Sequence, residues 1–171
     1  SNDWVIPSDL DEFNQYPVTL PELVHKLQTG FFTHMSGHLS DRISVSGELN
    51  GLLPIEDGVS IWKQYPLVGQ VTALLSRGRT DKVLISRGDL AWGMGHHQMR
   101  DADNLNSYPE LGVSHHFKWI GGLEQRLGWR IDNEQRVRLP WSEESLRLVN
   151  YFQQHGRVIH EHVAAIEGWH P

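Results

Sequence analysis

The longest periodic run in the chain is SEESLRLVNYFQQHGRVIHEHVAAIEGW, residues 142–169. Its apolar and half-polar side chains recur at alternating steps of four and three, the spacing of one face of an α-helix. These side chains are Leu148, Phe152, His155, Ile159, His162 and Ile166. Ser142 is a suitable N-cap, and Glu143 and Glu144 place negative charge at the positive end of the helix dipole. The run therefore predicts one helix over residues 142–168, with its apolar face buried.

Two further elements are predicted directly before this run. Residues 114–127 have helical spacing, with Ser114 available as an N-cap. The alternating segments at 129–131 and 136–139 flank the turn-prone tetrapeptide Asp132-Asn-Glu-Gln135, which favours a β-hairpin. The predicted order over residues 114–169 is therefore helix, hairpin, long helix.

This order, with Leu111-Gly-Val-Ser114 and Leu123-Glu-Gln-Arg-Leu-Gly128, resembles the C-terminal half of a winged helix-turn-helix protein of the MarR type. The resemblance implies a recognition helix in the major groove, a wing on phosphate and a homodimer formed through terminal helices. It would put Lys118 and Arg126 on the recognition helix and Arg130, Arg136 and Arg138 on the wing. Duplex DNA is the partner that it implies. The alternative is a helix and a hairpin that pack on the core, with solvated arginines.

The N-terminal half of the chain has shorter periodic segments. Residues 1–18 have no clean period and are expected to form an irregular arm. Thr19-Leu-Pro-Glu22 has the form of a capping box and predicts a helix start. Glycines punctuate short apolar runs from Asp41 to about Gln98, which favours short strands and turns. The predicted fold is α+β in one globular domain over residues 1–171: an N-terminal helix, a small glycine-punctuated sheet and a winged-helix-like C-terminal unit.

Composition narrows the function classes. The chain has no cysteine, which excludes disulfides, thiolate metal sites and a cysteine nucleophile. Its formal net charge of −6 argues against non-specific coating of nucleic acid. No apolar run approaches membrane-spanning length, so a soluble protein without membrane contact is expected. The absence of cysteine suits the cytoplasm and the periplasm alike, and a cytoplasmic location is the working expectation. The leading hypothesis is a non-enzymatic regulatory or interaction domain, with DNA or a protein as its partner.

A second hypothesis is a histidine-dependent enzyme. Arg157-Val-Ile-His-Glu-His162 is similar to the Arg, four residues, His motif of HEPN ribonucleases, in which the histidine acts in acid–base attack by the 2′-hydroxyl. The resemblance implies that Arg157 and His162 are catalytic. The alternative is that His162 packs on the apolar helix face and Arg157 is solvated.

Metal binding is a third hypothesis, because the chain contains eleven histidines. His34 and His38 lie four residues apart, as a helix would need to present both to one ion, and His155 could add a further ligand. Neutral imidazole suits zinc among other metals, so zinc is the candidate cofactor of a metal-assisted hydrolase. The alternative is a set of surface and half-buried histidines.

Overall fold

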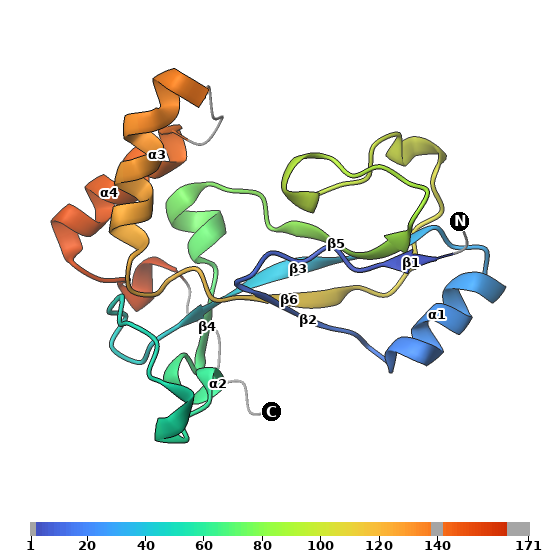
Figure 1. Ribbon diagram of the computed structural model, residues 1–171, viewed down its shortest axis with the longest axis horizontal. Helices are drawn as coiled ribbons and strands as arrows, with labels where there is room; N and C mark the ends of the chain where they lie inside the picture. The colour runs from blue at the N-terminus through green and yellow to red at the C-terminus, as the bar shows by residue number, and fades with distance from the viewer. Residues whose placement is uncertain (1–2, 138–141, 164–171) are drawn as a thin grey trace. The chain divides into compact units, whose positions relative to one another are not determined.

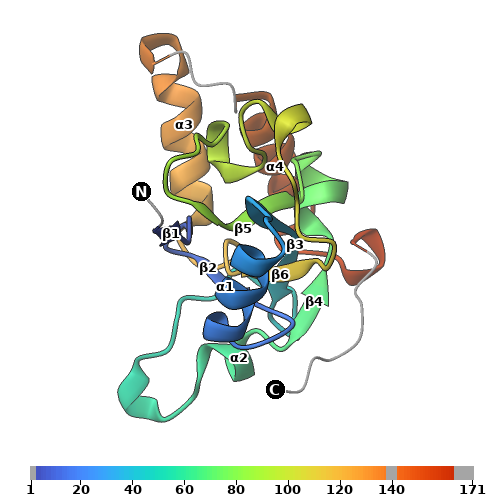
Figure 2. The same ribbon diagram turned by 90° about the vertical axis from the view of Figure 1, so that its right-hand side faces the viewer.

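The computed structural model describes residues 3–137 and 142–163, which form two compact units. Within these ranges, the first unit comprises Ser1–Ser40 and Arg79–His116, and the second comprises Asp41–Gly78 and Phe117–Pro171. The chain passes between the units three times, so neither unit is one continuous segment (Figures 1 and 2). The expectation of a single domain over residues 1–171 stays a prediction.

The first unit contains a sheet with the strand order β1-β5-β3-β6-β2. Its strands are β1 (Trp4–Val5), β2 (Glu12–Gln15), β3 (His34–Ile43), of which residues 41–43 belong to the second unit, β5 (Asp81–Arg87) and β6 (Gly112–His116). β5 is antiparallel to β1 and β3, and β2 is antiparallel to β6. Short 3₁₀ turns at Met94–His96 and Ala102–Asn104 connect β5 to β6. The segment expected to be an irregular arm thus supplies both edge strands.

Helix α1 (Leu20–Thr29) confirms the helix start predicted from the capping box. The Glu22 carboxylate accepts hydrogen bonds from the Thr19 backbone N–H at 3.1 Å and from the Thr19 hydroxyl at 2.7 Å. Leu23 and Leu27 have no exposed surface. They pack in an apolar core with Met35, Ile85 and Tyr108. The amphipathic spacing of α1 therefore anchors it in the core of the first unit.

The sheet of the first unit curls, because residues on strands that are not neighbours touch. The Tyr16 hydroxyl, directly after β2, donates to the Leu84 carbonyl of β5 at 3.1 Å. Two glycines make room for this approach. A Cβ at Gly37 would lie 2.4 Å from the Gly112 carbonyl oxygen, and a Cβ at either glycine would lie 2.5 Å from Leu84 Cδ1. Larger residues at these positions would force the strands apart.

The second unit contains mostly helices. Its elements are residues 41–43 of β3, β4 (Leu67–Gly69), α2 (Ile61–Gln64), a π-helix at Thr72–Ser76, α3 (Leu123–Val137), α4 (Ser142–His155) and 3₁₀ turns at Ile55–Asp57 and His160–His162. β4 is antiparallel to the last residues of β3. The core of this unit contains Ile43, Val71, Trp119, Leu123, Leu127, Leu148, Phe152, Val158 and Val163. The predicted burial of Phe152 is confirmed, since only 2% of it is exposed.

The winged-helix prediction is wrong. Residues 114–116, where the recognition helix was expected to begin, belong to strand β6, and residues 129–137 continue α3 where a hairpin was expected. Leu123 and Leu127 are buried four residues apart, and the partly buried Ile131 follows at the same step. This spacing continues the helical face, so Asp132-Asn-Glu-Gln135 belongs to α3 and is not a turn. The protein is instead a mixed α+β fold whose strands are spread over residues 4–116.

The prediction of one helix over residues 142–168 is also wrong, because α4 ends at His155. Gly156 has a φ of +68°, and its N–H donates to the Phe152 carbonyl at 2.7 Å. This left-handed glycine is a common helix stop. The chain then leaves the helical path, and the Val158 N–H donates to the Gly47 carbonyl at 2.8 Å. Ile166 lies outside the described residues.

Candidate functional site

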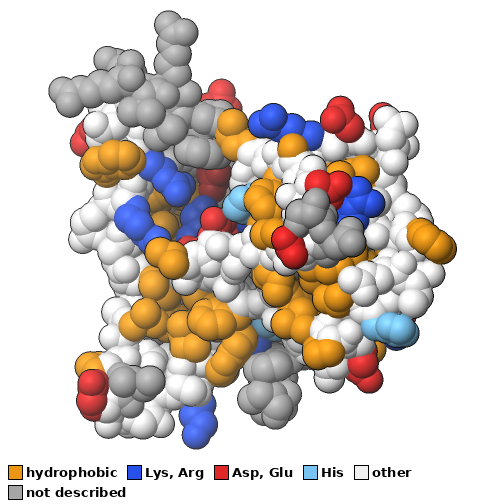
Figure 3. Space-filling model, turned by 45° about the vertical axis from the view of Figure 1, so that its right-hand side comes forward, with side chains coloured by type: hydrophobic (Ala, Val, Ile, Leu, Met, Phe, Trp, Pro, Cys, Tyr) orange, Lys and Arg blue, Asp and Glu red, His pale blue; other side chains and the backbone are white. Residues whose placement is uncertain are grey.

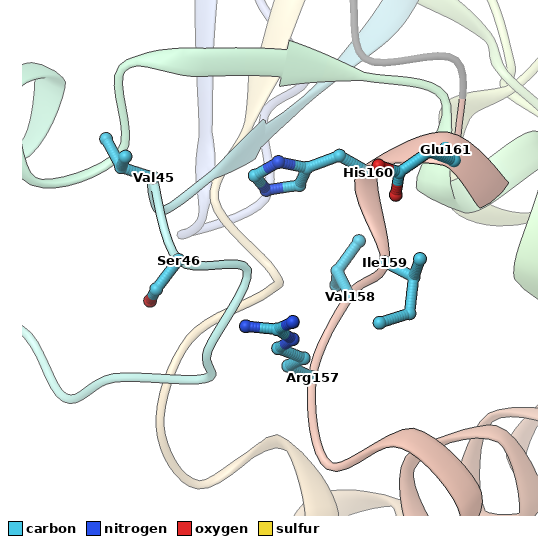
Figure 4. A pocket seen from close by; sticks show the side chains of 7 residues that line it. All are labelled: Val45, Ser46, Arg157, Val158, Ile159, His160 and Glu161. Carbon is cyan, nitrogen blue, oxygen red and sulfur yellow. The ribbon is translucent and has the colours of Figure 1, made fainter.

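A pocket of about 190 Å³ lies in the second unit, where residues 157–161 run beside residues 45–46 (Figure 4). Its lining consists of Val45, Ser46, Arg157, Val158, Ile159, His160 and Glu161. Gly47 allows the two segments to meet. It has a φ of +75°, and a Cβ there would lie 2.1 Å from the Val158 carbonyl oxygen. Gly156 turns the chain away from α4, and Gly47 allows the backbone at Val158 to approach closely. These two glycines therefore bring together the two segments that line the pocket.

Two oppositely charged side chains line this pocket. Arg157 and Glu161 are both exposed. Neither forms an ion pair or a hydrogen bond with any residue in the described part of the chain, and so they do not pair with each other. Figure 4 shows them at opposite ends of the lining, with Val158 and Ile159 between them. The pocket therefore has a cationic end, an anionic end and an apolar middle.

Neutral polar groups complete the lining. The Ser46 hydroxyl donates to the Glu48 carboxylate at 3.1 Å, which holds the hydroxyl beside the pocket. His160 is partly buried, and its Nε2 atom has no hydrogen-bond partner within residues 3–137 and 142–163. A buried nitrogen without a partner has a free-energy cost, which sets His160 apart from the two exposed charged residues of the lining.

A cluster of Tyr151, His155 and His162 adjoins the pocket segment. The Tyr151 hydroxyl accepts a hydrogen bond from the Ile159 N–H at 2.9 Å and lies 3.2 Å from His162 Nδ1. The ring centroids of His155 and His162 are 5.3 Å apart, and those of Tyr151 and His155 are 4.7 Å apart. Through Ile159, the cluster fixes the backbone that carries Arg157 and Glu161.

The two residues predicted to be catalytic lie near one another, but not on one helix. Arg157 lines the pocket, whereas His162 belongs to the adjoining cluster and is exposed. The expectation that His162 would be at least partly buried on the apolar face of a helix is therefore wrong, because that helix has already ended. The arrangement also lacks the shared helix that the HEPN resemblance requires. Catalysis by Arg157 and His162 stays a prediction.

The predicted metal ligands do not converge. His34 and His38 lie on strand β3, where residues four apart are separated by about 13 Å of backbone. His34 is buried, His38 is exposed, and His155 belongs to the other unit. Among the residues that the structure describes, no group of three or more histidine, aspartate or glutamate side chains could hold a metal ion. Zinc binding is therefore unsupported.

The residues predicted to contact DNA form no wing. Arg126, Arg130 and Arg136 lie on α3, Lys118 precedes it, and Arg138 lies outside the described residues. Lys118 forms an ion pair with Glu144 at 2.8 Å and lies 5.2 Å from the centroid of the Trp119 ring. Arg126 donates to the Lys118 carbonyl at 3.1 Å. These contacts give Lys118 and Arg126 roles within the second unit, and DNA binding is unsupported.

Sequence reasoning missed Ser46, His160 and Glu161 as pocket residues. Ser46 and Glu161 are separated by more than a hundred residues, and no local pattern pairs them. The only available signals were Gly47 and Gly156, because a glycine often marks a positive φ or a close backbone approach.

Comparisons of this chain with protein-family models, curated proteins and solved structures find no match. Across residues 3–137 and 142–163, no helix combines the length and the apolar character that crossing a membrane requires.

Proposed function

We propose that this chain is a binding domain whose second unit takes up a small zwitterion, a molecule with a carboxylate or phosphate at one end and an ammonium group at the other. One observation carries the proposal: Arg157 and Glu161 line one pocket without pairing with each other or with any other described residue. Opposite charges left apart in one pocket are complementary to a ligand that carries both charges.

The lining gives each part of such a ligand a partner. The planar guanidinium of Arg157 can donate two parallel hydrogen bonds to a carboxylate or phosphate. Glu161 can accept hydrogen bonds from an ammonium group, and the partly buried Ile159 can cover the aliphatic part between the charges.

The volume of the pocket limits the size of the ligand, and the exposure of its charged side chains limits the affinity. At about 190 Å³, the pocket is smaller than the range of about 300–1,000 Å³ typical of drug-sized ligands, so the ligand has few heavy atoms. Both charged side chains are exposed, so solvent and salt screen their attraction. We therefore expect modest affinity that falls as ionic strength rises.

Isothermal titration calorimetry with three matched compounds tests the proposal. β-Alanine carries both charges, propionate only the negative charge, and propylammonium only the positive charge. β-Alanine should bind about tenfold more tightly than either single ion, because only it satisfies both ends of the pocket. Arg157→Gln should remove this advantage over propylammonium, and Glu161→Gln should remove the advantage over propionate.

Arg126→Gln and Glu124→Gln are the matched controls, since both residues lie on α3 of the same unit and outside the pocket. Both control variants should bind β-alanine as the parent does. Equal affinity for β-alanine and the two single ions, or unchanged β-alanine binding in Arg157→Gln, would refute the proposal.

A further inference from the structure

The first unit has a separate pocket of about 360 Å³, within the usual range for small-molecule sites. Trp4 of β1, Leu27 and Gln28 of α1, Phe31, Phe32 and Arg87 of β5 line it. Half of these six side chains are aromatic. All six belong to the first unit, so this pocket is independent of the one that contains Arg157.

Phe31 occupies a backbone position that normally belongs to glycine. Its φ is +56°, in the left-handed region. Its N–H donates to the Gln28 carbonyl at 3.3 Å, and the Phe32 N–H donates to the Leu27 carbonyl at 2.9 Å. This pair of bonds is the Schellman motif that ends many helices, and its left-handed residue is usually glycine. Glycine would end α1 here without the steric cost of an aromatic side chain.

The Phe31 side chain gains little from folding. Large hydrophobic side chains are exposed at several places in this protein, including the face in Figure 3, and Phe31 is among the most exposed at 85%. The residue therefore combines an unfavourable backbone conformation with an apolar ring left in water. Residues in strained backbone conformations cluster at ligand-binding sites, where the strained conformation serves binding.

The other rings of the pocket are held in place. Phe32 packs edge-to-face on the buried Tyr108, with ring centroids 5.2 Å apart and planes at 90°. Trp4 packs against the core that contains Leu27. The pocket lining therefore combines two aromatic side chains that pack on the core with the exposed Phe31 ring.

The polar rim carries little net charge. The guanidinium of Arg87 donates two hydrogen bonds to the Asp89 carboxylate, from Nε at 3.0 Å and from Nη2 at 2.8 Å. This pairing offsets the positive charge that would otherwise attract an anion. The Gln28 amide can both donate and accept hydrogen bonds. The rim is therefore suited to a neutral ligand with a polar edge.

We propose that this pocket binds a neutral heteroaromatic small molecule, a flat ring stacked against Phe31 and Trp4 with its polar edge toward Gln28. Aromatic rings pair favourably in offset or edge-to-face geometry, and three aromatic side chains line the pocket. The neutral rim disfavours an anionic relative of the same ring.

Titrations of the full chain with indole, followed by amide chemical shifts in NMR spectra, test the proposal. Indole should perturb residues that line the pocket, while cyclohexanol and indoleacetate should bind at least about tenfold more weakly. Phe31→Gly should weaken indole binding by a similar factor without a loss of thermal stability, because glycine suits the left-handed position. Leu10→Ala is the matched control: it removes another exposed apolar side chain of this unit and should leave binding unchanged.

Three outcomes would overturn the proposal. Cyclohexanol could bind as tightly as indole, which would make the pocket merely apolar. Phe31→Gly could bind indole like the parent, which would leave the exposed ring without a role in the site. Finally, shifts at the pocket residues that depend on protein concentration and disappear in Phe31→Gly would show that a second copy of the chain occupies the pocket.

Discussion

Each unit buries a charged side chain, but the two units stabilise the charge differently. In the first unit, Lys82 is 2% exposed, and its ammonium group lies 2.7 Å from the equally buried Glu12 carboxylate. Asp9 and the Gly95 carbonyl accept its remaining contacts at 3.3 and 3.0 Å. In the second unit, Asp41 is 1% exposed, and three of its hydrogen bonds come from neutral donors. The Thr72 N–H, the Thr72 hydroxyl and the Trp119 indole N–H lie 2.6, 2.7 and 2.7 Å from it.

The difference determines how each site should respond to mutation. Removing Lys82 leaves Glu12 as a buried charge without its counter-ion, and removing Glu12 leaves the buried Lys82 ammonium with only the more distant, half-exposed Asp9 carboxylate. Asp41 accepts hydrogen bonds from three neutral donors, so the loss of one leaves the other two in place. A single substitution at the Lys82–Glu12 pair should therefore cost much stability. A single substitution among the donors to Asp41 should cost only the stability of the bond that is lost.

The largest effect is expected for Lys82→Met. This change keeps the length of the side chain but leaves Glu12 buried without its counter-ion, and it should lower the free energy of unfolding by about 3–5 kcal/mol. Urea denaturation measures this loss. Lys26→Met, at an exposed lysine of α1, is the matched control and should have little effect.

The double variant Lys82→Met, Glu12→Leu sharpens this test. Replacing both members of a buried ion pair by apolar residues leaves no uncompensated charge, so the double variant should be more stable than Lys82→Met alone. A double variant that is less stable than Lys82→Met would show that the two residues do not act as a pair.

A smaller effect is expected for Trp119→Phe in the second unit. The substitution removes the indole donor to Asp41 and should cost about 1.5–3 kcal/mol, the usual range for a hydrogen bond to a charged group. Trp129→Phe is the control, because Trp129 lies on α3 of the same unit and is 59% exposed. A loss in Trp119→Phe as large as that in Lys82→Met would contradict the contrast between the units.

Local signals in the sequence predicted local structure. The capping box at Thr19 specified the start of α1, and the spacing of Leu148 and Phe152 specified the buried face of α4. The prediction from this spacing extended the helix beyond His155, because Gly156, which adopts a left-handed conformation, was not taken as a helix stop. The hairpin assigned to residues 129–139 failed for a related reason: a short polar tetrapeptide was read as a turn although it also fits the exposed side of a helix.

The long-range arrangement lay beyond sequence reasoning. The edge strands β1 and β2 are two and four residues long, too short for a periodic signal. The pairing of Lys82 with Glu12 needs a curled sheet, and the pocket needs residues 45–46 beside residues 157–161. Arg157 was singled out by its resemblance to a ribonuclease motif, but its neighbours in the pocket follow only from the meeting of Gly47 and Val158.

The smallest effect concerns His34, a buried histidine of the first unit. Burial lowers the pKa of His34 below its usual value of 6.5. The native state therefore resists protonation, and the stability that this neutral histidine contributes is fully present above about pH 6.5. It falls as pH drops from there through the lowered pKa, because the unfolded chain binds the proton first.

Carboxylates titrate at the acidic end of the same range, so the parent must be compared with His34→Gln and with His38→Gln, a variant at an exposed position of the same strand. In urea denaturation at stepwise lower pH, His34→Gln should lose less stability than the parent, and His38→Gln should follow the parent. Parallel losses in the parent and His34→Gln would mean that the native state does not hold this imidazole neutral.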